Sequence, residues 1–140
     1  MHAASFKDLL VYKKAMAVAN NVFLLSKKFP REETFALTDQ VRRSSRSIGA
    51  QIAEAWGKRR YEKHFLSKLS DADGEQNETQ HWVGVALNCG YFTVLEANQL
   101  NNDLAEIGRM LNGMMGKSAL FCGDMSAVVK EDSTDYFTDN

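Results

Sequence analysis

Three arginines close together in this sequence have the chemistry to hold an anion. Arg42, Arg43 and Arg46 lie in the segment 40–56, which contains no proline and has the pattern of a helix. Arg42 and Arg46 are one turn apart on one stripe of that helix. Because a guanidinium pairs with either a carboxylate or a phosphate, ion pairing and phosphate contact both stay open for Arg42 and Arg46. We expect four other polar side chains to have structural or interface roles: Arg43, Gln51, Glu54 and Glu78.

A second basic group follows this helix and is predicted to form a loop. Its four cations cannot all be buried, so a solvated turn is the simplest interpretation. The alternative is a phosphate-binding rim, which an oligomer would repeat and so strengthen. The aromatic residues Trp56, Tyr61 and Phe65 lie near enough in sequence to stack on unpaired bases, although such residues are more often part of a core. The four cations are Lys58, Arg59, Arg60 and Lys63.

The sequence offers little for catalysis or metal binding. Glu78-Thr-Gln-His81 is the Glu-x-x-His motif of di-iron helical bundles, but it occurs once, which gives half a site. Cys89 and Cys122 are far apart and form no CxxC motif, and glycine-rich phosphate loops are absent. Ser44, Ser45 and Ser47 are small packing residues with no nearby base in the sequence, and no Ser/His/Asp or Cys/His set can be proposed. We therefore expect a non-enzymatic protein without a cofactor.

Charge is distributed unevenly along the 140 residues, although the net charge is only −1. Residues 1–41 carry net +2, residues 42–68 carry net +6, and residues 69–140 carry net −9. This asymmetry predicts a basic surface on part of the fold. Free thiols, and the lack of a signal-peptide profile or of a long apolar run, predict a soluble cytoplasmic protein with no membrane partner.

Apolar residues recur at steps of three and four through most of the chain, the spacing of one face of a helix. Phe29-Pro30 separates the first two helices, Gly57 ends the second, and Thr93-Val-Leu-Glu96 is a capping box that opens the fourth. Short turns between long helices predict an all-α, antiparallel up-down-up-down four-helix bundle in residues 1–116. The expected helices are about 6–28, 32–56, 60–90 and 94–115.

Two further features complete the prediction. Gly74 and Gly84 weaken the third helix and indicate close packing against another backbone, whereas Gly90 is expected near its end. Residues 117–140 are expected to form an acidic, partly disordered tail. Two apolar segments of this tail, Leu120-Phe121 and Ala127-Val-Val129, could dock on the bundle. The acidic tail could fold over the basic group and compete with nucleic acid, or its charge could keep an oligomer soluble. The sequence leaves both alternatives open.

The order of these residues resembles a family of small bacterial four-helix-bundle proteins that are often encoded within intervening sequences of 23S ribosomal RNA genes. The accessory proteins of diversity-generating retroelements are more distant relatives. The resemblance implies a homopentamer with a central channel and a nucleic-acid-binding role. Trp56 departs from the family pattern, which has glycine near this position. The resemblance covers about residues 6–115 and is carried by Phe6-x-x-Leu9, Tyr12-x-x-Ala15, Phe29-Pro30, Leu37-x-x-Gln40-x-Arg42-Arg43-x-x-x-Ser47-Ile48, Gln51-Ile-Ala-Glu54, Phe65, Ala72-x-Gly74-x-x-x-Glu78, Gly90-Tyr-Phe92 and Ile107-x-x-Met110-Leu111.

Three hypotheses about function follow. The first is an oligomeric accessory protein that binds RNA or DNA, with no small-molecule substrate. The second is a structural or protein-interaction module in which Arg43 and Glu54 are paired and buried. The third is a carboxylate-bridged metalloenzyme, which the single Glu-x-x-His motif supports only weakly. Under the first hypothesis, the nucleic-acid contacts are Arg42, Arg46, Lys58, Arg59, Arg60 and Lys63.

Overall fold

The protein is a four-helix bundle, as the sequence predicts. A computed structural model describes residues 3–123. No helix of this part of the chain is both long enough and apolar enough to cross a membrane. The long helices are α1 (Leu10–Ser26), α2 (Asp39–Gly57), α3 (Glu62–Asn88) and α4 (Val94–Gly116).

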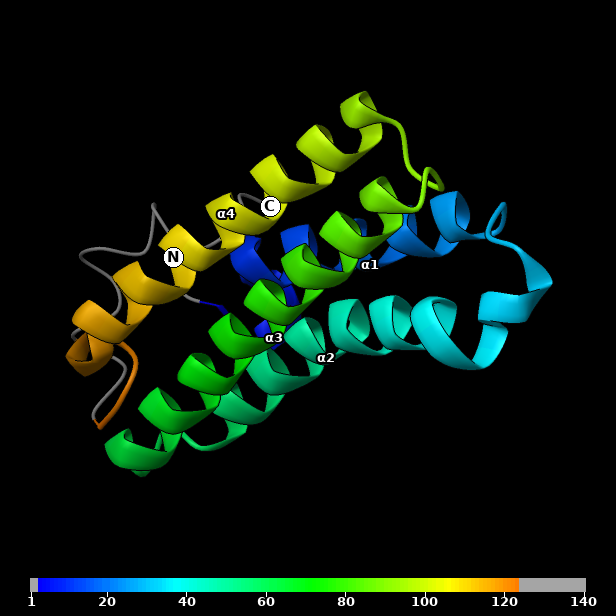
Figure 1. Cartoon of the computed structure of the whole chain (residues 1–140). Helices are drawn as coiled ribbons and strands as arrows, with labels where there is room; N and C mark the ends of the chain where they lie inside the picture. The colour runs from blue at the N-terminus through cyan, green and yellow to red at the C-terminus, as the bar shows by residue number, and fades with distance from the viewer. Residues whose placement is uncertain (1–2, 124–140) are drawn as a thin grey trace.

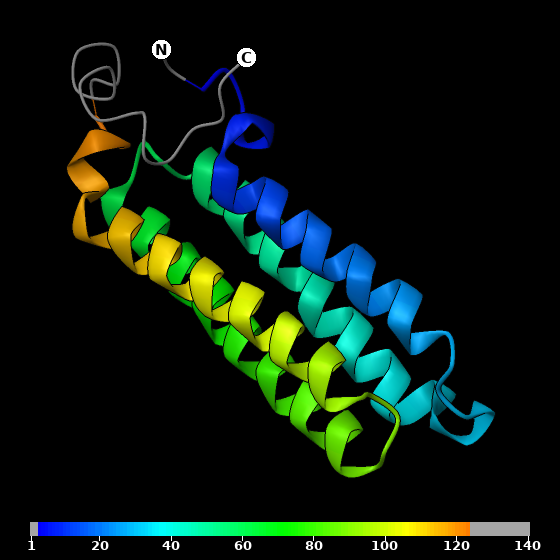
Figure 2. The ribbon, with the colours of Figure 1, turned by 90° about the horizontal axis from the view of Figure 1, so that it is seen from above.

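The helices run antiparallel to their neighbours in the chain and form a closed ring of contacts (Figure 1). α2 packs between α1 and α3, and α4 packs between α3 and α1. Figure 2 shows that the start of α1, the α2–α3 turn and the end of α4 share one end of the bundle. The α1–α2 and α3–α4 connections share the other end. The turn that carries the second basic group is therefore close to the point where α4 ends.

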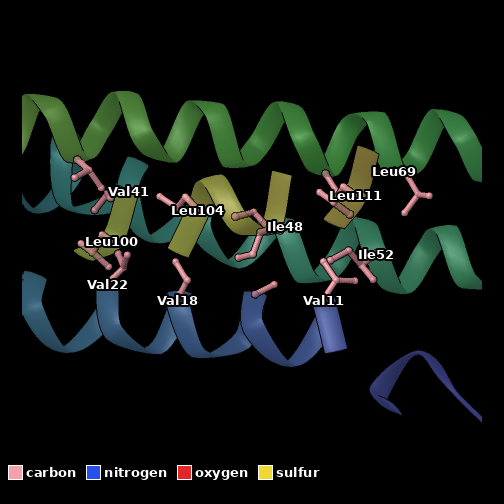
Figure 3. Close-up of a cluster of buried hydrophobic side chains, with 14 of the residues drawn as sticks. Val11, Val18, Val22, Val41, Ile48, Ile52, Leu69, Leu100, Leu104 and Leu111 are labelled. Atoms are coloured by element: carbon pink, nitrogen blue, oxygen red, sulfur yellow. The ribbon is translucent and has the colours of Figure 1, made fainter. Parts of the chain in front are cut away.

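The core fills the space between the four helices with aliphatic side chains (Figure 3). Each helix contributes fully buried residues at steps of three, four and seven, which places them on one face. Burying a side chain of this size contributes about 1.5–3 kcal/mol relative to leaving it exposed. The central layers contain Val18 and Val22 of α1, Val41, Ile48 and Ile52 of α2, Leu69 of α3, and Leu100, Leu104 and Leu111 of α4.

The first helix begins later than predicted. Phe6–Asp8 form a separate 3₁₀ turn, whose N-terminus is closed by a capping box between Ser5 and Asp8. Leu9 then takes an extended conformation (φ −69°, ψ 130°), and α1 starts at Leu10. Leu9 is buried in this conformation, so its side chain reaches the core from a bend that precedes α1 and not from a continuous helix.

The second helix also departs from the predicted continuous rod. Arg31–Glu33 form a 3₁₀ turn, and Thr34–Thr38 form a π-helical turn with an irregular residue at Ala36 (φ −121°, ψ −106°). This wide turn points Leu37 and Thr38 into the bundle, where both are buried. Phe35 points outward instead and is 94% exposed. The spacing of apolar residues in the sequence cannot reveal such a turn, because the apolar row that begins at Leu37 fits a regular helix equally well.

The ends of α3 and α4 agree with the sequence, whereas two glycines inside α3 do not. Thr93 and Glu96 form the expected capping box at the start of α4. Gly90 follows the end of α3 and takes a positive φ of 77°, which suits glycine. The predicted close packing at Gly74 and Gly84 is not found within the subunit, since a methyl group at either position would meet nothing within 4 Å among the described residues.

The chain after α4 is more ordered at its start than the predicted tail. Ser118–Leu120 form a 3₁₀ turn, η4, and the next residue, Phe121, is 1% exposed. The Phe121 ring stacks on Phe65 of α3, with ring centroids 5.8 Å apart. The docking of Leu120-Phe121 is thus confirmed, and residues 117–123 belong to the bundle. The predicted contact of residues 127–129 lies outside the described residues.

Candidate nucleic-acid interface

The α2–α3 turn presents a group of cations, Lys58, Arg59, Arg60 and Lys63, which we call the turn cluster. Gly57 ends α2, and the amide of Tyr61 closes the turn by donating to the Lys58 carbonyl at 2.9 Å. Lys58, Arg60 and Lys63 are exposed. Within residues 3–123, none of these three side chains forms an ion pair. They are therefore free to meet an anion from outside this part of the chain.

Arg59 differs from the other members of the turn cluster because it is fixed against the bundle. Its guanidinium carbon lies 3.5 Å from the centre of the Trp56 ring, and its Nε donates to the Trp56 carbonyl at 2.8 Å. Burial lowers the pKa of Arg59, and the nearby Cys122 opposes this effect. Trp56 thus serves as a platform for Arg59, a role the sequence did not indicate.

The two carboxylates nearest to the turn cluster in sequence have partners elsewhere. Glu54 pairs with Lys68 of α3 at 3.1 Å. Glu62 accepts a hydrogen bond from the Ser118 hydroxyl at 2.5 Å. Neither contact neutralises Lys58, Arg60 or Lys63, so the positive charge of the turn is retained.

Among the three aromatic residues near the turn, only Tyr61 is available for stacking on a base. Tyr61 is 58% exposed, and its ring lies 5.6 Å from the His64 ring, between centroids. Phe65 is buried in the core, and the Trp56 ring is covered by Arg59. An exposed tyrosine between cations matches the mixture of charge and stacking that single-stranded nucleic acids need.

Arg42 and Arg46 form a second basic site, which we call the arginine row. Both guanidinium groups lie over the Phe23 ring of α1, at 4.8 Å and 5.4 Å from its centroid. Arg42 Nε also donates to the Ser26 hydroxyl at 2.8 Å. Neither arginine pairs with a carboxylate within the part of the chain that the structure describes. The Phe23 ring holds both guanidinium groups without neutralising their positive charge.

Arg43 has a different partner, which the sequence offered as one of two alternatives. It forms an ion pair with Glu78 of α3 and lies 3.8 Å from Glu75. Glu78 also accepts a hydrogen bond from Trp82 Nε1 at 3.0 Å. The predicted buried pair of Arg43 with Glu54 is wrong for this chain, because Arg43 is exposed and Glu54 pairs with Lys68. Glu54 lies about three turns further along α2 and meets a different part of α3.

Gln51, the remaining predicted structural residue, is half-buried in α2. Its Oε1 atom is buried and has no hydrogen-bond partner within residues 3–123. Glu78 and His81, the half metal site of the sequence, do not gather further ligands: the described residues contain no group of three or more His, Cys, Asp or Glu side chains placed to hold a metal ion.

The two basic sites do not form one continuous patch. Arg42 and Lys58 are sixteen residues apart, which is about 24 Å along a helix axis. The arginine row instead lines an open hollow of about 620 Å³ together with Arg43 and the exposed Phe35. A smaller groove of about 210 Å³ runs between α1 and α2, where Arg46 and Phe23 line it beside small residues. The turn cluster lies at the other end of α2.

Comparison with known proteins gives the family of this chain. No curated protein matches it. A solved structure that is similar to it is the crystal structure of a protein of unknown function from the S23 ribosomal protein family of Bacteroides thetaiotaomicron, with 32% sequence identity and a TM-score of 0.69. The match covers 76% of this chain and 98% of that chain. The model of the 23S rRNA-intervening sequence protein family matches residues 7–113, and the chain therefore belongs to this family.

Proposed function

We propose that this protein is a non-enzymatic homo-oligomer, a pentamer as the family resemblance implies, that binds ribosomal RNA or DNA as an accessory protein. The observation that carries this proposal is the turn cluster, with its three exposed cations that no described carboxylate neutralises. Charge of this kind attracts phosphate and releases counterions on binding. Tyr61 adds a surface on which a base can stack.

Oligomerisation supports binding through repetition of a weak site. One turn cluster offers few phosphate contacts, so a single subunit would bind weakly at physiological salt. Several copies on one assembly raise the effective concentration of each further contact. The arginine row is a second set of contacts on the same helix, held in place by Phe23.

The binding experiment uses the full chain with fluorescently labelled single-stranded RNA, hairpin RNA and duplex DNA. Anisotropy titrations run from about 50 to about 200 mM salt, the range over which phosphate contacts lose most of their effect. The variant Lys58→Gln/Arg60→Gln/Lys63→Gln removes three charges of the turn cluster. We expect it to weaken binding at least tenfold at low salt and to flatten the salt dependence, by a slope of up to about 3.

A matched control removes the same total charge elsewhere. Lys7→Gln/Arg31→Gln/Arg109→Gln changes three exposed cations on other elements. We expect its affinity to stay within about threefold of the parent, because long-range charge alone is screened within about 10 Å. Equal losses in both variants would show that net charge and not the turn cluster drives binding. Absence of binding to every probe at low salt by the parent and by both variants would overturn the proposal.

One observation favours a second candidate, a protein-interaction module without nucleic-acid binding. Phe35 is 94% exposed beside a hollow, which is typical of an anchor for another protein surface. In that case the arginines would act at an interface between proteins. The titrations above separate the two candidates, since the interaction module predicts no RNA or DNA binding.

A further inference from the structure

The last described residues of the chain return to the turn cluster. η4 follows α4, and Phe121 anchors it by stacking on Phe65, three helical positions after Glu62. Ser118 donates to Glu62, which is the carboxylate inside the turn cluster segment. These contacts fix the direction of the chain at the end of the bundle where α2 and α3 meet (Figure 2).

Cys122 continues the docked turn, and its amide donates to the Ser118 carbonyl at 3.1 Å. Its thiol is half-buried; burial and the charge of Glu62 raise the pKa of this thiol, and Arg59 lowers it. The described part of the chain ends one residue later, at Gly123, whose positive φ of 77° turns the backbone. The described chain therefore ends at the same end of the bundle as the turn cluster (Figure 2).

The composition of this segment is complementary to the turn cluster. Residues 124–140 contain five acids and one lysine, for a net charge of −4, while the turn cluster holds four cations and one acid, Glu62. Four of the acids fall in residues 131–139, and Tyr136-Phe137 lies among them. Carboxylates interleaved with aromatic rings present the same chemistry as the phosphates and bases of a single strand.

The connection is long enough for these acids to reach the cations. Glu131 is the eighth residue after Gly123, and eight extended residue steps can span about 26–29 Å. Ser118, five residues before Gly123, already contacts Glu62 within the turn cluster segment, so the length of the tether does not limit contact. A short tether gives an effective concentration in the millimolar range, which lets weak ion pairs form within one chain.

We propose that residues 124–140 bind the turn cluster of their own subunit and compete with nucleic acid for it. The competition rests on the proposed function, whereas the intramolecular contact does not. Nucleic acid with many phosphates displaces the segment at low salt. Short or sparsely charged ligands bind too weakly to displace it. The site is thereby selective for ligands that engage several subunits at once.

The first test detects the contact without any nucleic acid. A carbodiimide reagent joins a lysine amine directly to a carboxylate in the full chain, and mass spectrometry identifies the joined peptides. We expect links from Lys58 or Lys63 to Glu131, Asp132 or Asp135, and their loss at about 1 M salt, where the Debye length falls to about 3 Å. A mixture of normal and ¹⁵N-labelled chains separates links within a subunit from links between subunits.

The second test measures competition with variants of the full chain. Glu131→Gln/Asp132→Asn/Asp135→Asn removes three charges of the segment. Glu32→Gln/Asp71→Asn/Glu106→Gln removes three exposed or half-exposed carboxylates elsewhere and is the matched control. We expect the segment variant to bind the labelled RNA of the earlier titrations at least fivefold more tightly than the parent, and the control to stay within twofold.

The outcomes separate this inference from the proposed function. Cross-links within a subunit, without RNA or DNA binding by any variant, would leave the contact standing and remove its competitor. Nucleic-acid binding with no such cross-links and no gain in the segment variant would overturn the inference alone. Links found only between subunits would overturn the intramolecular form. Equal gains in both variants would show a general charge effect and would also overturn it.

Discussion

Neighbouring arginines of α2 meet different chemical groups, although they are nearly adjacent in sequence. Arg43 is directed at α3, where Glu78 neutralises it. Arg42 and Arg46 are directed at α1, where the Phe23 ring supports them without removing their charge. Since one residue along a helix is a rotation of about 100°, a single step decides whether the guanidinium meets a carboxylate or a ring. Arg42 and Arg46 are thus available for phosphate, and Arg43 is not.

Glu75 lies next to the Arg43–Glu78 ion pair, and its pKa is shifted in the folded chain. Burial raises the pKa of Glu75, Arg43 lowers it, and Glu78 and Asp71 raise it further, with a net upward shift. One of its oxygen atoms is buried without a hydrogen bond within the described chain. A carboxyl group whose pKa is higher in the folded chain weakens the fold when it ionises. The free energy of unfolding is therefore reduced as the pH rises through the unfolded and then the folded pKa.

Glu75→Gln is expected to remove this penalty. The melting temperature should rise by about 1–2 °C near neutral pH, because only the ionised form is unfavourable. The gain should vanish below about pH 4, where the carboxyl group is protonated in both states. Thermal unfolding measured across this pH range provides the check. Glu32→Gln, which changes an exposed carboxylate, serves as the control. A gain that persists unchanged in acid would contradict the assigned cause.

At the scale of the helices, the glycines have different roles. Gly108 of α4 is buried against α3, where an added methyl group would lie 2.8 Å from Gln76 Nε2. Gln76 is itself buried and donates to Asp73 Oδ1 at 3.0 Å. At Gly84 of α3 an added methyl group would meet nothing within 4 Å among the described residues. Gly108 is thus required by packing and Gly84 is not.

Two alanine substitutions are expected to have opposite effects on stability. Gly84→Ala should raise the free energy of unfolding by about 1 kcal/mol, the difference in helix propensity between the two residues. Gly108→Ala gains the same propensity, but displaces Gln76 and its hydrogen bonds and overpacks the α3–α4 contact. It should lower the free energy of unfolding by about 1 kcal/mol in total. Urea unfolding of both variants tests the order. A loss of stability in Gly84→Ala would show that this glycine contacts another subunit.

At the scale of the whole molecule, the exposed apolar surface offers contacts for the proposed assembly. Phe35 stands outside the bundle at the π-helical turn, next to the hollow that the arginine row lines. The groove between α1 and α2 has a floor of small residues, including Ala19 and Gly49. A projecting phenyl group and a groove on different parts of one surface could form a head-to-tail interface between subunits. Such an interface gives a closed cyclic oligomer when the rotation between neighbouring subunits permits closure.

Phe35→Ser is expected to weaken the proposed assembly. Light scattering of the parent should give a mass several times that of the 15.7 kDa chain, and five times for the proposed pentamer. Loss of a central anchor costs at least about 2 kcal/mol per interface, so the concentration for dissociation should rise about thirtyfold or more. Leu95→Ser changes another exposed apolar side chain, on α4, and should leave the mass unchanged. The same mass for the parent and for Phe35→Ser would contradict the role of Phe35.

The sequence alone determined the four helices, their antiparallel order and most of the core. Apolar residues at steps of three and four allow one helical face to be buried, and short connections force neighbouring helices to run in opposite directions. Local chemistry also fixed several ends, such as the Thr93 cap of α4. The position of the turn cluster between α2 and α3 followed from the same reasoning. These features depend on residues close together in the chain, and sequence shows them directly.

Only the tertiary structure decided which side chains meet across helices. The ring of Phe23 below the arginine row, the Glu54–Lys68 pair and the stacking of Phe121 on Phe65 join residues far apart in sequence. Such contacts depend on how far each helix is rotated and shifted along its axis. Small irregularities, such as the π-helical turn that turns Phe35 outward, change that rotation without altering the apolar period. The basic residues were visible in the sequence, but which of them keep their charge was settled by packing.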